Sequence, residues 1–254
     1  MYPVINLDKK NILIFGASKG IGQACAKVCD RLDAQVILSA RDIRGLNNTK
    51  SMLNRNAHIY DYDLTNTEGI ESLISQIVTE CGKLDGIIYC SGVTDNRPLA
   101  MQKPEFVNNL FKVNFMSYME TVRCFAKKAN HNECSSVVGI ASVASELGTK
   151  AHEAYAASKG AMIAASKSMA SELHTKGIRV NCVSPGTTRT EMIEEYLSNC
   201  ENTGSDVGNR LLERQYLGMI EPEYIGYAVA FLLSDASKFV TGFNLPVDGG
   251  LLSV

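Results

Sequence analysis

The amino-acid sequence predicts one α/β domain in which helices cover both faces of a doubly wound parallel sheet. Short apolar runs alternate with amphipathic stretches of helical period along the chain, which is typical of that fold class. A glycine-rich turn at residues 16–22 joins the first apolar run to the first helical stretch. No proline-, glycine- or serine-rich linker and no repeat divides the 254 residues, so we expect a single domain over residues 1–254.

The composition favours a globular protein whose partners are small molecules or further copies of itself. Hydrophobic residues make up 45% of the chain, which is enough for a well-buried core. The 25 basic and 27 acidic residues nearly cancel, so nothing indicates binding to nucleic acid or to an anionic membrane. Residues 1–10 lack a leader pattern and the apolar runs are too short to span a bilayer, so we expect a cytoplasmic protein.

The eight cysteines form neither a metal-binding nor a disulfide pattern, because they are scattered without a C-x-x-C pair. Cys25 and Cys29 would share a helix face, but no histidine lies near them in sequence to complete a zinc site. We therefore expect free thiols, buried or partly buried, and no metal.

The first strand is expected at residues 11–15, followed by the turn Gly16-x-x-x-Gly20-x-Gly22 and by a helix from Gln23 to Arg31. Glycine permits a tight turn and a close approach of the backbone to a pyrophosphate, which the positive end of the following helix would attract. The spacing differs from the commoner G-x-G-x-x-G fingerprint, and an ordinary tight turn is the alternative.

The second strand, expected at residues 35–39, is followed by residues that favour NADP(H) over NAD(H). A site for NAD usually has a carboxylate at the end of this strand, which binds the ribose 2′-hydroxyl. Here Ser39 ends the strand, and Arg41 and Lys19 could bind a 2′-phosphate. NAD(H) stays possible because Asp42 could pair with Arg41 or bind the ribose itself.

Two further strands are expected at residues 58–60 and 86–89. Asp63 follows the third strand and could accept a hydrogen bond from an adenine amino group, or cap a helix that starts near Thr65. The small residues of Cys90-Ser91-Gly92 follow the fourth strand and would let the chain pass close to a cofactor.

Tyr155 and Lys159 are the strongest candidates for chemistry. In a helix over residues 153–176 they would lie one turn apart on the same face. A nearby ammonium favours the phenolate, whose unperturbed pKa is about 10, and would make the tyrosine an acid and a base nearer neutral pH. Ser142 lies thirteen residues before the tyrosine. Alone, such a pair also occurs by chance on solvated helix faces.

Several motifs, taken in order, resemble the short-chain dehydrogenases/reductases of the compact single-domain type. The match spans nearly the whole chain and rests on the glycine turn, Asp63, Asn114, Ser142, Tyr155, Lys159, Asn181, Pro185-Gly186, Thr190 and Val247-Asp248-Gly249-Gly250. Length and motif order are similar to those of 3-oxoacyl-carrier-protein reductases. The resemblance implies a Rossmann-type sheet of about seven strands and a nicotinamide dinucleotide cofactor.

The resemblance also implies a role for each residue of a catalytic tetrad. Tyr155 would be the acid/base, and Ser142 would bind and polarise the substrate carbonyl. Lys159 would bind the nicotinamide ribose and lower the pKa of Tyr155. Asn114 would hold a water that links Lys159 to solvent. The implied cofactor contacts are Gly16, Ser18, Lys19, Gly20, Ile21, Gly22, Ser39, Arg41, Asp63, Leu64, Ser91, Gly92, Pro185, Gly186, Thr188 and Thr190.

The chain departs from the family pattern at two places. Tyr89-Cys90-Ser91-Gly92 stands where the family commonly has Asn-Asn-Ala-Gly, which removes an amide that tethers the fourth strand to its neighbour. Phe15 replaces the threonine that usually precedes the first glycine. We expect a structural cost from these changes and retained activity.

The expected function is that of an NADPH-dependent oxidoreductase, which reduces a ketone to a secondary alcohol or catalyses the reverse reaction on a small or carrier-bound substrate. Lys127, Lys128 and Lys176 are expected near the active-site rim, where they could meet an acidic carrier. Sugar, steroid and polyol dehydrogenases of the same family are alternatives, and a non-catalytic dinucleotide-binding sensor is another. The sequence leaves the natural substrate, the direction and the stereochemistry open.

A substrate lid is expected at about residues 190–219, because a long insertion follows the Pro-Gly turn there. Glu146, His152 and Arg189 are polar candidates near the substrate, although His152 is expected mainly to help start the helix. The other walls of the pocket are expected at residues 93–103 and 143–152.

Assembly is inferred from the resemblance. The helices around residues 104–130 and 153–176 commonly form one interface in this family, and a tail such as residues 244–254 commonly forms a second. We therefore expect a homotetramer with two-fold axes, or a homodimer.

Overall fold

The computed structural model describes residues 5–94, 96–191, 193–194 and 213–253. Within them, seven parallel strands form one sheet in the order β3-β2-β1-β4-β5-β6-β7. The strands are β1 (Asn11–Phe15), β2 (Gln35–Ala40), β3 (His58–Asp61), β4 (Leu84–Tyr89), β5 (His131–Ile140), β6 (Ile178–Pro185) and β7 (Asn244–Val247). The predicted doubly wound parallel sheet is confirmed, and each predicted strand agrees with the observed one to within two residues at its ends.

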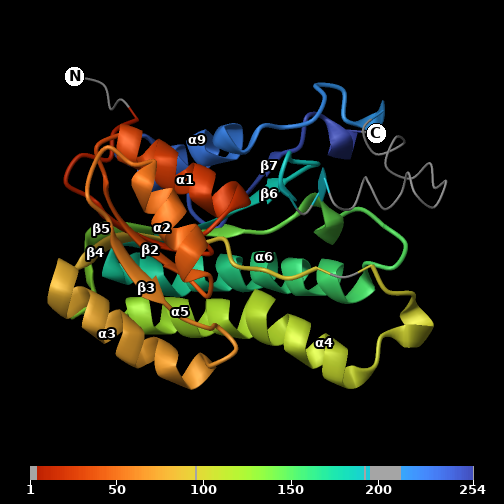
Figure 1. Cartoon of the computed structure of the whole chain (residues 1–254), viewed down its shortest axis with the longest axis horizontal. Coiled ribbons are helices and arrows are strands. Elements are labelled where there is room, and N and C mark those ends of the chain that lie inside the picture. The colour runs from red at the N-terminus through yellow and green to blue at the C-terminus, as the bar shows by residue number, and fades with distance from the viewer. Residues whose placement is uncertain (1–4, 95, 192, 195–212, 254) are drawn as a thin grey trace.

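Helices cover both faces of the sheet (Figure 1). On one face lie α1 (Gly20–Arg31), α2 (Ile43–Ser51) and α9 (Pro222–Leu233). On the other lie α3 (Ile70–Cys81), α4 (Pro104–Phe111), α5 (Ser117–Phe125) and α6 (Glu153–Leu173). Single 3₁₀ turns occur at Thr67–Gly69, Leu99–Met101, Val143–Ser145, His174–Lys176, Asp235–Ser237 and Leu251–Ser253. Over the described ranges, no helix is both long enough and apolar enough to cross a membrane.

Strand β1 divides the core into two layers. Ile12 and Ile14 pack with the apolar side chains of α1 and α9, whereas Leu13 and Phe15 pack with those of α3, α5 and α6. Successive side chains of a strand point to opposite faces, so a strand covered on both sides must be apolar at nearly every position. That requirement explains why the first strand appears in the sequence as an unbroken apolar run.

A π-helical segment, Lys112–Met116, joins α4 to α5, where the sequence predicted one continuous helix. Such a segment widens the helix, and it often marks a functional site. The Tyr89 hydroxyl at the end of β4 donates a 2.6 Å hydrogen bond to the Val113 carbonyl within it. The phenol therefore ties β4 to the neighbouring helical layer, which offsets the lost amide tether that the sequence indicated.

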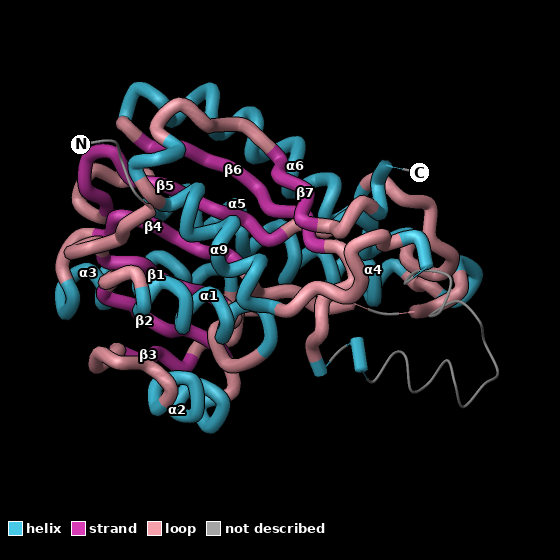
Figure 2. Tube along the Cα trace, turned by 90° about the horizontal axis from the view of Figure 1, so that it is seen from above, coloured by secondary structure: helices cyan, strands magenta, loops and turns pink. Residues whose placement is uncertain are grey.

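The middle of the sheet is the place where the chain changes direction. Strands β1 and β4 are neighbours there, and the chain winds outward from them on either side (Figure 2). Ligands of open parallel sheets bind beyond the carboxyl ends of the strands at such a switch point. The glycine turn follows β1 and Cys90-Ser91-Gly92 follows β4, so both predicted cofactor loops lie at this edge.

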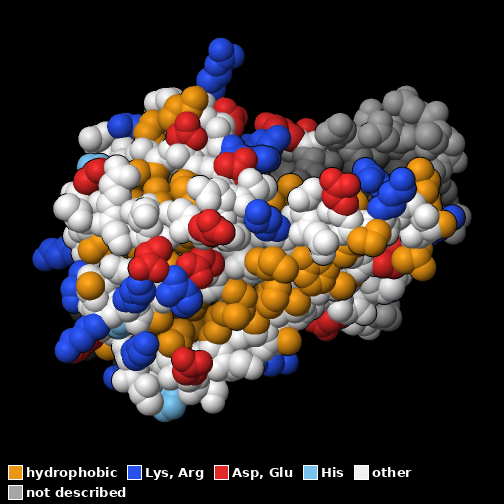
Figure 3. All heavy atoms as spheres, turned by 90° about the horizontal axis from the view of Figure 1, so that it is seen from below, with side chains coloured by type: hydrophobic (Ala, Val, Ile, Leu, Met, Phe, Trp, Pro, Cys, Tyr) orange, Lys and Arg blue, Asp and Glu red, His pale blue; other side chains and the backbone are white. Residues whose placement is uncertain are grey.

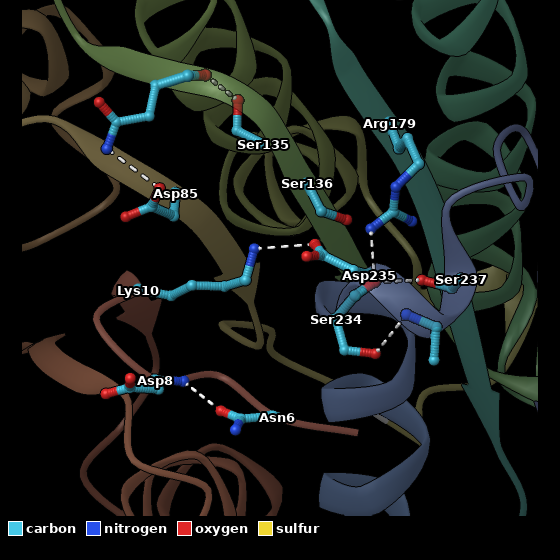
Figure 4. Close-up of polar contacts among 12 residues, drawn as sticks. Asn6, Asp8, Lys10, Asp85, Ser135, Ser136, Arg179, Ser234, Asp235 and Ser237 are labelled. Carbon is cyan, nitrogen blue, oxygen red and sulfur yellow. Dashed lines mark hydrogen bonds and ion pairs between the residues drawn. The ribbon is translucent and has the colours of Figure 1, made fainter. Parts of the chain in front are cut away.

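Polar contacts fasten the opposite, amino-terminal edge of the sheet (Figure 4). Lys10, next to β1, forms an ion pair of 3.1 Å with Asp235. Arg179 in β6 donates a 3.2 Å hydrogen bond to the Ser234 carbonyl. These contacts join the starts of β1 and β6 to the end of α9, and they therefore stabilise the fold at this edge.

Candidate active site

The glycine turn has no room for a side chain at Gly16 or Gly22. A Cβ on Gly22 would lie 2.1 Å from the Gly16 carbonyl oxygen, and one on Gly16 would lie 2.8 Å from the Ser91 nitrogen. Gly16 and Gly20 also have φ angles of +80° and +57°, which glycine adopts without strain. The turn thus rests directly on the loop after β4, which brings together the two loops at the switch point.

Two polar side chains that the sequence analysis did not single out hold this turn. The Thr49 hydroxyl, fully buried in α2, donates a 2.8 Å hydrogen bond to the Ala17 carbonyl. Gln23 of α1 donates to the same hydroxyl at 2.9 Å. The Ala17 carbonyl is held on the side of the turn that faces α2. The N–H groups that follow it are therefore presented on the opposite side, away from α2.

The end of β2 resolves the ambiguity around Arg41. Asp42 caps α2, because its carboxylate accepts hydrogen bonds from the N–H groups of Arg44 and Gly45. Arg41 instead faces Asp63, whose carboxylate lies 3.9 Å from the guanidinium. The predicted alternative in which Asp42 pairs with Arg41 is therefore wrong, because helix capping occupies that carboxylate.

Asp63 does not cap a helix. Its carboxylate accepts a 2.8 Å hydrogen bond from the Thr65 N–H, and that bond lowers the pKa of Asp63 more than Arg41 does. The helical turn begins at Thr67, and the Asn66 side chain caps it. The suggested helix start near Thr65 is thus two residues too early, and Asp63 lies beside Arg41 at the predicted adenine end.

Lys19 and Arg41 do not converge. Lys19 forms a 3.0 Å ion pair with Glu191, on the side of the glycine turn that faces Thr190. A Cβ on Gly20 would lie 3.4 Å from the Thr190 methyl group, so this threonine borders the turn. The two cations predicted to bind one phosphate thus pair with different carboxylates of the protein.

The remaining predicted cofactor contacts lie along the same edge. Ser18 and Ile21 belong to the glycine turn, Ser39 is the last residue but one of β2, and Leu64 follows Asp63. Ser39 is 1% exposed, and its hydroxyl is one of two buried side-chain oxygens without a hydrogen-bond partner among the described residues. Burying a hydroxyl without a hydrogen-bond partner costs free energy, and no described residue offsets that cost for Ser39.

Lys159, Tyr155 and Asn114 meet behind Gly92. The Lys159 side chain is 4% exposed, its ammonium donates a 2.7 Å hydrogen bond to the Ile140 carbonyl, and it lies 5.8 Å from the centre of the Tyr155 ring. A Cβ on Gly92 would lie 3.3 Å from the Lys159 nitrogen and 3.4 Å from the Asn114 oxygen. Three predicted tetrad members, two from α6 and one from the π-helical segment, are thus brought to one place.

Asn114 is held as firmly as a backbone group. Its side-chain oxygen accepts a 2.8 Å bond from the Val93 N–H, and its nitrogen donates to the Val93 carbonyl at 2.9 Å and to Ser158 at 3.0 Å. These bonds fasten the loop after β4 to the π-helical segment and to α6. The described contacts therefore give Asn114 a positioning role in this loop.

Ser142 and Tyr155 face one another across the site. Ser142 follows β5 with an extended backbone, and its hydroxyl accepts a 3.1 Å bond from the Ala144 N–H. The Ser142 side chain lowers the pKa of Tyr155 and so works against the effect of burial on it. Two hydroxyls therefore lie together beside a buried ammonium.

Burial controls the ionisation of this pair more than mutual attraction does. It lowers the pKa of Lys159 from 10.5 to about 8, with the Cys90 thiol acting in the opposite direction. It raises the pKa of Tyr155 above its usual value of 10, although the Ser142 side chain opposes that shift. The predicted depression of the tyrosine pKa is therefore wrong, because desolvation dominates and the ammonium is bonded to Ile140.

The Pro185-Gly186 turn follows β6 and is held against the end of β7. The Gly186 N–H donates a 2.9 Å bond to the Val247 carbonyl, and a Cβ on Gly186 would lie 2.8 Å from the Cα atom of Asp248. Asp248 accepts bonds from the N–H groups of Gly250 and Leu252. The C-terminal motif is thus a clasp that fixes the turn.

The residues after the turn pair with Ile220. Its N–H donates to the Thr187 carbonyl at 3.0 Å, and its carbonyl accepts from the Arg189 N–H at 2.8 Å. Because backbone groups alternate in direction along an extended chain, the N–H and carbonyl of Thr188 point to the other side. Thr188, one of the implied cofactor contacts, thereby offers a backbone donor and acceptor on that side.

The residues present fit a nicotinamide dinucleotide. Glycines leave the carboxyl edge of β1 and β4 open to a close backbone approach, and α1 begins at the glycine turn with its unpaired N–H groups. Further along the edge are Arg41, Asp63 and the hydroxyls of the tetrad. Together they supply donors for a pyrophosphate and acceptors or donors for two riboses.

The three lysines expected near the active-site rim, Lys127, Lys128 and Lys176, lie at the opposite end of the molecule from Tyr155. Lys127 follows α5 and pairs with Glu71, and Lys176 donates to the Ala126 carbonyl at 3.1 Å. Lys176 follows the last turn of α6, about 30 Å along the helix from Tyr155. Lys127 and Lys128 precede β5, whereas the site lies after it. That prediction is therefore wrong, because the lysines border the amino ends of the strands.

The two segments expected to form the other walls of the substrate pocket, residues 93–103 and 143–152, lie side by side. The Arg97 N–H donates to the Ala151 carbonyl at 3.2 Å, and Gln102 donates to Glu153 at 2.6 Å. His152 is edge-on to the ring of Tyr155, with 6.1 Å between ring centres, and its side chain makes no capping bond to the helix. Of the three expected polar residues, His152 is the one next to the tetrad.

The other two polar candidates have structural partners. Glu146 accepts a 3.1 Å bond from Asn244, and Arg189 donates to Glu221 at 2.8 Å. Residues 192 and 195–212 of the expected lid lie outside the described part of the chain.

The cysteines of the described residues are free. Most are buried or partly buried as expected, but Cys134 is exposed because it lies in a bulge where β5 shifts register against β4. Cys200 lies outside the described residues. Glu71, Glu120 and Cys124 form a group that could bind a metal ion, yet Arg123 bonds both carboxylates at 2.7 Å. The Arg123 guanidinium therefore neutralises the two carboxylates in place of a metal ion.

Comparison with known proteins places these motifs in context. A short-chain dehydrogenase family model described as enoyl-(acyl carrier protein) reductase matches residues 16–252. The 3-oxoacyl-(acyl-carrier-protein) reductase FabG of Rickettsia bellii is 33% identical, over 99% of this chain and all of that protein. The FabG of Salmonella typhimurium is 31% identical, over 98% of this chain and all of that protein. A crystal structure of a dehydrogenase/reductase from Sinorhizobium meliloti superposes with a TM-score of 0.88 at 28% identity, covering 97% of this chain and 96% of that one.

Proposed function

Because the chain belongs to the short-chain dehydrogenase/reductase family, we propose that it is an NADP(H)-dependent oxidoreductase that interconverts a ketone and a secondary alcohol. The observation that carries this proposal is the buried Lys159 ammonium, 5.8 Å from the ring of Tyr155 and next to Gly92 at the switch point of the sheet. A buried cation beside a phenol and a serine hydroxyl is an arrangement suited to proton transfer.

The residues of the chain handle the proton and the charge of this reaction. A bound nicotinamide supplies or accepts the hydride. In the reductive direction, Tyr155 gives its hydroxyl proton to the carbonyl oxygen while Ser142 donates a hydrogen bond to it. The tyrosinate that remains is stabilised by protonated Lys159, and a proton from solvent restores the phenol. Asn114 keeps the loop at Gly92 in place beside the ammonium.

The preference for NADP(H) rests on the end of β2. The carboxylate that follows β2, that of Asp42, caps α2 through one of its oxygens and is thus partly engaged, which disfavours it as the partner of a ribose 2′-hydroxyl. Arg41 is well exposed, with its nearest described carboxylate 3.9 Å away on Asp63, so a 2′-phosphate can compete for its planar donors. Lys19 contributes less, because Glu191 already pairs with it.

The substrate proposed is a small or carrier-bound ketone. Relatives at 31–33% identity are named as 3-oxoacyl-(acyl-carrier-protein) reductases, which favours a 3-oxoacyl group. Sugars, steroids and polyols stay as alternatives within the same chemistry. A turnover rate that is the same for acetoacetyl-carrier protein and for free diketones would argue against the carrier.

The test is the oxidation of NADPH and of NADH with a panel of ketones by the wild type and Tyr155→Phe. We expect the wild type to prefer NADPH and the variant to lose about 10²–10⁴-fold in turnover, because its side chain has no proton to give. Tyr224→Phe is the control, since Tyr224 is 64% exposed on α9. Full turnover by Tyr155→Phe would contradict the assignment of the acid, and binding without any turnover would favour a sensor.

We also propose a homotetramer, or a homodimer, with α4 and α5 in one interface. The face of the molecule seen from below in Figure 3 carries a band of hydrophobic side chains. Met116 and Met119, at the junction of these helices, are 51% and 40% exposed. Apolar patches of this kind on a soluble protein favour association with another copy.

A further inference from the structure

Gln215 is a buried polar side chain in the segment that leads to Ile220, and no motif of the sequence contains it. It is 1% exposed. Its side-chain oxygen accepts a 2.7 Å hydrogen bond from the Thr187 N–H, and its nitrogen donates to the Thr187 carbonyl at 3.1 Å. One amide side chain thus pairs with both backbone groups of a single residue, as an adjacent strand would.

The glutamine fits there because two glycines leave room for it. A Cβ on Gly186 would lie 2.6 Å from the Gln215 oxygen, and one on Gly249 would lie 2.7 Å from its Cγ atom. Its nitrogen also donates to the Gly218 carbonyl. The side chain therefore joins the Pro-Gly turn, the C-terminal clasp and its own segment, which are far apart in sequence.

This contact determines which way the next residue faces. Thr187 is bonded to Gln215 through both backbone groups and to Ile220 through its carbonyl. With Thr187 fixed on one side and Arg189 bonded to Ile220 on the other, the backbone of Thr188 has little freedom to rotate. Its N–H and carbonyl are thereby aimed away from these partners.

We propose that Gln215 is a positioning residue for the nicotinamide half of the cofactor. It acts through Thr187 on the backbone of Thr188, and it does not touch the adenine half, which lies with Arg41 and Asp63 on the other side of the switch point. The proposal rests on the proposed function. It adds that affinity for the two halves of the dinucleotide is set by separate parts of the chain.

The test compares two ligands on the full-length protein by calorimetry. NADP⁺ contains both halves, whereas 2′,5′-ADP has only the adenine half. For Gln215→Met, which keeps the length of the side chain and removes its hydrogen bonds, we expect NADP⁺ to bind at least tenfold more weakly and 2′,5′-ADP to bind within twofold of wild type. Gln35→Met is the matched control, because Gln35 also donates to a backbone carbonyl, that of Asn56 at 2.9 Å.

Gln215→Glu provides the same test if Gln215→Met does not fold. It keeps the size of the side chain and an acceptor for the Thr187 N–H but has no amide donor, so the same split between the two ligands is expected. Hydrogen exchange over residues 186–190 should also become faster in either variant. An equal loss for both ligands, or no loss for either, overturns the proposal. Wild-type protein that binds neither NADP⁺ nor NAD⁺ overturns the proposed function itself, and this proposal with it.

Discussion

At the scale of single residues, burial and bonding decide what each charged group can do. Asp42 and Asp63 are both placed to bind a ribose or an adenine, yet Asp42 is used to cap α2 and Asp63 faces Arg41. The sequence predicts that both carboxylates lie near the carboxyl ends of the strands, where the structure has them. The sequence cannot assign their roles, because a side chain caps a helix only if the helix begins at the next residue, and the sequence does not fix helix starts to a single residue.

The pH dependence of catalysis follows from Lys159. Burial lowers its pKa to about 8, so the ammonium that stabilises the tyrosinate is lost above that pH. We expect kcat/KM for ketone reduction, which reports groups of the free enzyme, to be level below pH 8 and to fall above it, approaching tenfold per pH unit. The same shift means that burial of the charged lysine costs stability below about pH 8 and that this cost disappears as the pH rises to 10.5.

The measurement is a pH–rate profile from pH 6 to 10 with a ketone as the substrate, together with thermal unfolding at each pH. The unfolding control separates a titration from a loss of structure. A profile that stays level to pH 10 in folded protein contradicts a role for the ammonium of Lys159.

The candidate catalytic residues could be predicted from the sequence, and the residues that hold the site in place could not. Tyr155, Lys159, Ser142 and Asn114 recur in a fixed order that can be recognised in one sequence. Gln215 has no such signature, because a single glutamine in a loop is usually exposed and only the fold shows that two glycines make room for it.

At the scale of elements, the glycine turn and the π-helical segment are the parts that differ from regular structure. The turn was predicted from its three glycines, since their spacing leaves few other interpretations. The π-helical segment was not predicted, because the apolar spacing of residues 104–125 is close to that of an ordinary helix. Its cause lies in partners from other elements, namely Tyr89 of β4 and Val93 of the following loop.

Gly22→Ala should disable the glycine turn. The new Cβ would lie 2.1 Å from the Gly16 carbonyl oxygen, so the turn must open. We expect a loss of about 1–3 kcal/mol in the free energy of unfolding and a loss of NADPH binding of at least tenfold. Urea unfolding and fluorescence titration with NADPH measure the two effects.

Gly148→Ala is the control for this variant. A Cβ on Gly148 meets no atom within 4 Å, so the free energy of unfolding should change by less than about 0.5 kcal/mol. Equal NADPH affinity for Gly22→Ala and wild type would mean that the turn does not bind the pyrophosphate.

At the scale of the whole molecule, the predicted order of strands and helices agrees with the structure because both faces of a parallel sheet must be covered. That requirement leaves a strong apolar pattern in the sequence. The expectation that Lys127, Lys128 and Lys176 lie near the active-site rim was wrong for a reason that also concerns the whole fold. They precede β5 or end α6, and in a parallel sheet such positions lie opposite the active site.

Light scattering should give a mass of four times 27.6 kDa if the proposed tetramer forms. Met116→Arg places a charge in the apolar band on the face of α4 and α5, so the assembly should become smaller. Ile43→Arg, at a residue 42% exposed on α2, is the control and should leave the mass unchanged. A wild-type mass of 27.6 kDa would exclude the assembly.

The clasp between Gly186 and Val247 has a consequence for the order in which the protein becomes active during synthesis. All four tetrad residues have been made once residue 159 is in place, but the turn after β6 is held by a strand that is made almost last. A nascent chain can therefore fold its first strands and expose its proton donor long before it can seat a nicotinamide ring.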